Sequence, residues 1–160
     1  MNFSQIFSSP IVYPLNILRF LARPFFISIN TDFEIDQAAR ERNVVVMTGA
    51  TDFVSDGVRT FAISNGHELL GKITGSGCVL GTAISLSLAV SRGDKFLAAL
   101  AGLLHYEIAA EIAAAREDVR GPGTFVPALI DELYKIHKST SQGDWKWLER
   151  AKVEAFNTST

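Results

Sequence analysis

The residues with the clearest chemical potential lie in a short glycine-rich stretch around the only cysteine of the chain. Residues 74–78 read Thr-Gly-Ser-Gly-Cys, and an apolar run follows over residues 79–90. This run predicts a helix that is apolar nearly all round and therefore buried. The first N–H groups of a helix lack acceptors within it, and the helix dipole adds partial positive charge there. We therefore predict a loop that binds anions, phosphate above all. The residues of this anion-binding loop are Gly75, Ser76, Gly77 and Cys78.

The thiol of Cys78 is a potential base or nucleophile in this loop. It lies in the first turn of the predicted helix, where the dipole favours a thiolate. A small apolar side chain inside a buried helix would give the same local pattern, so both interpretations stay open at this point.

Two other phosphate-binding patterns fit only in part. Residues 66–73 have the glycine and lysine spacing of a P-loop, but Ile73 stands where that motif needs Ser or Thr. Residues 75–81 resemble a dinucleotide fingerprint with one extra residue. That fold needs a strand after the first helix, whereas this sequence continues with further helices.

Strands and turns are expected before the anion-binding loop. Residues 44–47 form a continuous apolar run, which is typical of a strand buried on both faces in a parallel sheet. Thr48 and Gly49 end that strand, and open α/β sheets bind ligands beyond the carboxyl ends of their strands. Residues 52–57 are turn-like, and residues 58–64 favour a second strand.

The dipeptide Asn65-Gly66 is a strong hairpin signal. It predicts that residues 67–73 return as a strand and lead directly into the anion-binding loop.

Helices are expected at both ends of this region. Asp32 is suited to cap a helix over residues 31–42. An alanine-rich segment over residues 95–117 predicts a long helix with close packing, and a further helix starts at Gly123 or Thr124. The sequence therefore predicts three consecutive helices after the strands.

Polar side chains in these elements have simple interpretations. We expect Asp52 and Asp56 to be solvated turn residues. Glu107 and Glu111 lie four residues apart on a helix, so they are exposed or paired elsewhere. His105 and Tyr106 are expected to serve packing.

Composition excludes several classes of protein. The 15 Lys and Arg nearly balance the 17 Asp and Glu, and no basic stripe indicates nucleic-acid binding. One cysteine excludes a disulfide framework and fits a reducing compartment, so we expect a cytoplasmic protein. The three histidines are isolated, so no zinc site is predicted. No apolar run reaches the roughly 18–20 residues of a membrane-spanning helix.

Four motifs together resemble the hydroxyethylthiazole kinase family, and most of all the kinase part of the fungal bifunctional enzymes of thiamine biosynthesis. They are VVVMTGATDFVSDG at 44–57, SNGHELL at 64–70, TGSGC at 74–78 and GPGTFVPALIDELY at 121–134. The resemblance implies a ribokinase-like α/β/α fold, of which this chain forms the C-terminal portion. It also implies transfer of the ATP γ-phosphoryl group to the hydroxyl of 4-methyl-5-(2-hydroxyethyl)thiazole, with magnesium.

The resemblance also implies roles for single residues. Thr48, with Gly49 beside it, would contact ATP, and Gly75 would line the thiazole site. Residues 75–78 would form the anion hole for the transferring phosphoryl group. Cys78 would replace the catalytic aspartate of other ribokinase-like kinases and accept the proton of the alcohol.

The family domain extends upstream of the similar region, and that upstream part carries an arginine that contacts ATP and the acidic magnesium ligands. Residues 1–30 do not resemble it, and we interpret them as an atypical or poorly ordered segment. We therefore expect an N-terminally truncated kinase domain over residues 31–152, a tail over residues 153–160, and no metal ligand in this chain. The family is trimeric with active sites at subunit interfaces, which this chain would form only if the shortened sheet still assembles.

Two other functions stay open. The missing elements suggest an inactive kinase fragment that binds nucleotide or joins other subunits. The dinucleotide-like spacing suggests an NAD(P)-binding oxidoreductase, which would bind NAD(P) tightly.

Overall fold

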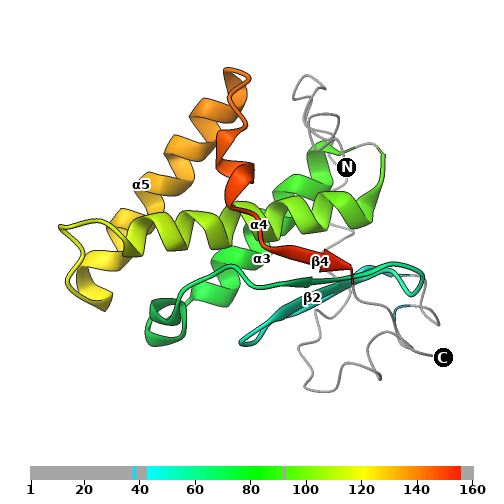
Figure 1. Ribbon diagram of the computed structural model, residues 1–160, viewed down its shortest axis with the longest axis horizontal. Helices are drawn as coiled ribbons and strands as arrows, with labels where there is room; N and C mark the ends of the chain where they lie inside the picture. Colours follow the sequence, from blue (N-terminus) through cyan, green and yellow to red (C-terminus); the bar gives the residue numbers. More distant parts are fainter. Residues whose placement is uncertain (1–37, 39–42, 92, 156–160) are drawn as a thin grey trace.

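The computed structural model describes Ala38 and residues 43–91 and 93–155 (Figure 1). The segment 1–30 lies outside these residues, and so does the helix expected over residues 31–42, except for Ala38, which is helical and buried.

Four short strands form one antiparallel sheet. In sheet order they are β1 (Val45–Met47), β2 (Asp52–Ser55), β3 (Thr60–Ile63) and β4 (Val153–Ala155). Every neighbouring pair in this sheet is antiparallel. The expectation that residues 44–47 lie in a parallel sheet is therefore wrong for the described strands. The expectation that this strand is buried on both faces is also wrong, because only Val46 of β1 is buried.

The hairpin turn lies at residues 56–59, which the sequence analysis divided between a turn and a strand. Gly57 has a φ of 83°, and Asp56 Oδ1 accepts hydrogen bonds from the backbone N–H groups of Val58 (3.0 Å) and Arg59 (2.7 Å). These contacts close a tight turn, and strands joined by such a turn must be antiparallel. The residues before it, Asp52–Ser55, form β2 and are not a turn.

The hairpin predicted at Asn65-Gly66 is wrong. Asn65 is buried, and its side chain donates to Arg150 O (2.9 Å) and accepts from Lys152 N (2.7 Å). This contact guides β4 into the position beside β3 that a return strand would occupy. The chain leaves the sheet instead, and residues Glu68–Lys72 form the short 3₁₀ helix η2.

The prediction of three consecutive helices is confirmed. They are α3 (Ser76–Val90), α4 (Lys95–Ala114) and α5 (Pro122–Ser141), followed by the 3₁₀ helix η3 (Lys146–Arg150). Helix α3 is not buried all round, however. Only Leu80 and Ile84 of α3 are buried, while Val79 is 44% and Leu86 52% exposed. The reason is that α3 lies against α4 along one face.

Helix α4 is the centre of the described fold. It contacts α3, α5, β2 and η3, and it crosses the middle of the molecule in Figure 1. By length and hydropathy, α4 would qualify as a membrane-spanning helix, but 78% of the qualifying window is buried inside the fold. That burial is what the core helix of a globular domain requires.

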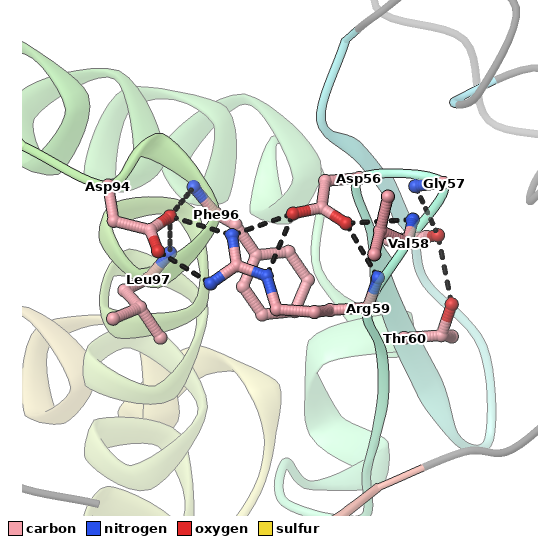
Figure 2. A network of polar contacts seen from close by, with 9 residues as sticks. Asp56, Gly57, Val58, Arg59, Thr60, Asp94, Phe96 and Leu97 are labelled. Atoms are coloured by element: carbon pink, nitrogen blue, oxygen red, sulfur yellow. Dashed lines mark hydrogen bonds and ion pairs between the residues drawn. The ribbon is translucent and has the colours of Figure 1, made fainter.

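Arg59 joins the hairpin turn to the start of α4 (Figure 2). Its guanidinium group donates to Asp56 Oδ2 (2.6 and 2.9 Å) and to both carboxylate oxygens of Asp94 (2.5 and 3.0 Å). The guanidinium carbon lies 4.3 Å from the centre of the Phe96 ring. Asp94 also caps α4 by accepting from the N–H groups of Phe96 and Leu97. The sheet and α4 are thereby fixed to each other at this end.

We predict that Gly102→Ala destabilises the fold by about 1–3 kcal/mol, because overpacking forces neighbouring backbone to move. A Cβ at Gly102 would lie 2.8 Å from Ile84 Cα, so only glycine permits the observed approach of α3 to α4. Chemical denaturation would measure the loss. The matched control is Gly81→Ala, which has open space around its Cβ and should gain up to about 1 kcal/mol. Equal stability of the two variants would contradict the packing described here.

Candidate active site

The N-terminus of α3 has free backbone donors, as the sequence predicts for an anion-binding loop. Gly75 is the N-cap residue, with a left-handed φ of 86°. Since glycine has no side chain, the first turn of α3 receives no cap hydrogen bond from this residue. The N–H of Val79 donates to Gly75 O at 3.0 Å, which closes the first turn. Among the described residues, the N–H groups of Ser76, Gly77 and Cys78 have no acceptor. Three donors at the positive end of a helix dipole can together bind an anion.

Cys78 is exposed and its thiol is free. The alternative of a small apolar side chain inside a buried helix is therefore wrong. The thiol and the free donors belong to the same first turn, so a group bound by those donors would lie close to Cys78.

Thr48 and Gly49 lie in the turn between β1 and β2. The N–H of Gly49 donates to Asp52 Oδ1 at 2.7 Å, so Asp52 fixes this turn. Asp52 itself is only 4% exposed, and the expectation of a solvated turn residue is wrong.

A second buried carboxyl group, that of Glu107 on α4, lies near Asp52. Glu107 is 5% exposed. Burial raises the pKa of Glu107 far above its usual range, and the nearby carboxyl groups of Asp52 and Glu111 raise it further. Glu107 Oε2 has no hydrogen-bond partner among the described residues.

The neighbouring residue on α4 reaches the anion-binding loop. The hydroxyl of Tyr106 donates to Ser76 O at 3.0 Å, and burial with the nearby Glu107 raises the pKa of Tyr106 to about 12. Tyr106 therefore connects α4 to the start of α3.

Glu111, one turn further along α4, holds the segment that leads from β3 toward the anion-binding loop. Its Oε1 accepts from Asn65 Nδ2 (3.1 Å), Gly66 N (3.2 Å) and Lys152 Nζ (2.9 Å). Of the two outcomes expected for Glu107 and Glu111, pairing elsewhere is the one that Glu111 adopts, whereas Glu107 is buried and its Oε2 has no hydrogen-bond partner among the described residues.

The described part of the chain contains no group of three His, Cys, Asp or Glu that could hold a metal ion. A surface hollow does occur beside Arg59 and Lys95, at the end of β2 opposite to Thr48, so it does not include the predicted site.

Sequence reasoning missed the roles of Asp52, Tyr106 and Glu107. A usable signal existed for two of them, because a tyrosine and a glutamate adjoin in an otherwise apolar helix. For Asp52 the signal was its position three residues after Gly49, a spacing that lets a carboxylate accept from a turn N–H.

Comparisons with known proteins identify the family of the chain. The model of the hydroxyethylthiazole kinase family matches residues 29–139. The chain belongs to this family. It is 43% identical over 123 residues to a protein named probable thiamine biosynthetic bifunctional enzyme from Schizosaccharomyces pombe, covering 73% of this chain and 24% of that protein. It is 47% identical over 103 residues to a hydroxyethylthiazole kinase from Pyrococcus horikoshii, covering 64% of this chain and 37% of that protein.

A solved structure of the same family has a similar fold. The hydroxyethylthiazole kinase protein from Pyrococcus horikoshii OT3 superposes with a TM-score of 0.68 at 36% identity, covering 79% of this chain and 46% of that chain. The predicted fold class, part of a ribokinase-like α/β/α fold, is confirmed. The chain spans less than half the length of these relatives, and none of them supports an NAD(P)-binding oxidoreductase.

We predict that Gly75→Ala destabilises this kinase-family chain by about 1–2 kcal/mol, because a Cβ strains the left-handed conformation. The neighbouring Gly77→Ala is the control, since its Cβ would meet nothing within 4 Å. It should be neutral or stabilising by up to about 1 kcal/mol. Thermal or chemical denaturation of the two variants distinguishes them, and equal destabilisation would contradict the left-handed N-cap.

Proposed function

We propose that this chain supplies the phosphoryl-transfer part of a hydroxyethylthiazole kinase. The reaction is phosphorylation by ATP of the hydroxyl of 4-methyl-5-(2-hydroxyethyl)thiazole, in thiamine biosynthesis or salvage. The single observation that carries the proposal is the set of three free N–H groups at Ser76, Gly77 and Cys78, which lie beside an exposed thiol. Family membership supports the identity of the substrates.

The free N–H groups act on the transferring phosphoryl group. Phosphoryl transfer needs little covalent chemistry from the protein and depends on positioning and charge stabilisation. Donors fixed at a helix N-terminus stabilise the charge on the equatorial phosphoryl oxygens without reorganising during the reaction. Gly75 lines the thiazole site in this arrangement, and Thr48 with Gly49 contacts ATP.

Cys78 handles the proton. The hydroxyl oxygen of the thiazole forms a bond to the γ-phosphorus while the bond to the bridging oxygen breaks and ADP leaves. The hydroxyl proton passes to Cys78 Sγ, which acts as a general base in its thiolate form.

Magnesium ordinarily neutralises charge on the phosphates of ATP. Since the described residues contain no metal cluster, no step is assigned to a metal held by them. An inactive fragment that binds nucleotide or joins other subunits is the alternative, and the family relatives do not favour it. A cytoplasmic location and the trimer of the family stay predictions.

We predict that Cys78→Ala lowers kcat for thiazole phosphorylation about a hundredfold or more, the usual contribution of a general base. The assay is formation of thiazole phosphate by the purified chain with ATP and magnesium. The matched control is Val79→Ala, which removes the exposed neighbour of Cys78 on α3 and should keep the wild-type rate. ATP binding without turnover by the wild-type chain would support the inactive fragment, and unchanged turnover by Cys78→Ala would contradict the role of the thiol.

A further inference from the structure

Helix α3 has an exposed face that carries no charge. None of its residues, Ser76–Val90, is Asp, Glu, Lys or Arg. Besides Gly77, the exposed residues of α3 are Cys78, Val79, Thr82 and Leu86. At 3.6 residues per turn these four lie within an arc of about 100°, opposite to the buried Leu80 and Ile84. A helix face that meets water normally carries charged and polar side chains, so the uncharged α3 face is unusual for a surface.

The hydroxyl groups on and beside the α3 face are bonded within the helix. Thr82 Oγ1 donates to Cys78 O at 2.9 Å, and Ser85 Oγ donates to Gly81 O at 2.7 Å. Such bonds satisfy the hydroxyl donors without water. The apolar side chains of the face, Val79 and Leu86, are 44% and 52% exposed. The face is therefore suited to burial against another apolar surface.

Strand β1 has a second surface of this kind. It is the outermost strand on its side of the described sheet, so one of its edges has no strand beside it within the described residues. Residues 44–47 are Val-Val-Val-Met, without a charge or a proline. Native sheets protect an edge that meets water with charged residues, proline, a bulge or a covering segment. An apolar edge strand therefore indicates that a further strand belongs beside β1.

The family relatives indicate what would cover both surfaces. This chain corresponds to 46% of the solved kinase from Pyrococcus horikoshii, and its match with the curated kinase of that organism covers 37% of that protein. More than half of such a kinase is therefore additional to the part that this chain matches. A second copy of this chain would not supply that part.

We propose that the α3 face and the free edge of β1 dock a second polypeptide that carries the remaining part of a hydroxyethylthiazole kinase domain. This partner adds a strand to β1 through main-chain hydrogen bonds and packs apolar side chains on Val79 and Leu86. Cys78 and the free N–H groups of α3 lie at one end of the same face, so the partner also borders the candidate active site. The docking rests on family membership and not on the proposed chemistry.

The first test uses the full chain alone. Leu86→Lys places a charged group on the α3 face, and Ile130→Lys is the matched control on α5, where Ile130 is 60% exposed. Because both positions meet water in the isolated chain, each variant should change Tm by less than about 2 °C. A much larger loss of Tm in Leu86→Lys alone would show that the face is already covered, and would overturn the proposal.

The second test co-expresses the full chain with the part of the Pyrococcus horikoshii kinase that it does not match. Light scattering of the purified material should give the mass of a one-to-one complex for the wild type and for Ile130→Lys. Leu86→Lys should weaken the complex about tenfold or more, because docking would bury an unpaired charge. Amide hydrogen exchange of residues 45–47 should slow about tenfold or more in the complex, since a paired edge protects its N–H groups.

Three results would overturn the docking surface. They are the absence of a complex after co-expression, a complex that Leu86→Lys leaves unchanged, and a dimer of this chain alone that Leu86→Lys disrupts, which would assign the face to a second copy. Complex formation is measured without ATP, so it does not depend on catalysis. If the complex forms as expected but neither binds ATP nor phosphorylates the thiazole, the proposed function fails while the docking surface stands.

Discussion

The described structure depends on helix α4 being buried on most sides while still making polar contacts. Its small residues let α3 approach so closely that Gly102 leaves no space for a Cβ. Two of its polar side chains hold neighbouring segments. Tyr106 donates to Ser76 at the start of α3, and Glu111 accepts from Asn65, Gly66 and Lys152. The fold and the candidate site therefore depend on the same helix.

The free N–H groups at the start of α3 follow from local geometry. Gly75 provides a left-handed N-cap without a side chain that could bind the first turn, in contrast to Asp94, whose carboxylate caps α4. A capping carboxylate at position 75 would occupy the donors that an incoming phosphoryl group needs. Glycine at this position thus lowers helix stability slightly and leaves the site open.

Features set by local sequence could be predicted, and features set by distant contacts could not. The three helices and the glycine N-cap of α3 follow from hydrophobic patterns and glycines nearby in the chain. The hairpin expected at Asn65-Gly66 fails because β4, nearly ninety residues later, takes the place beside β3. Burial of Asp52 is likewise invisible locally, since α4, which packs against β2, lies far along the chain. The apolar composition of α3 predicts more burial than the described residues provide.

The central claim is that the free N–H groups of residues 76–78 bind phosphate oxygens, and titration of the isotope-labelled chain with ATP tests it most directly. Nitrogen–proton correlation spectra report each backbone N–H separately. The account predicts saturable shifts that are largest at Ser76, Gly77 and Cys78, accompanied by smaller shifts at Thr48 and Gly49. Shifts confined to other parts of the chain, for example around Arg59, or no saturable shift at all, would contradict it.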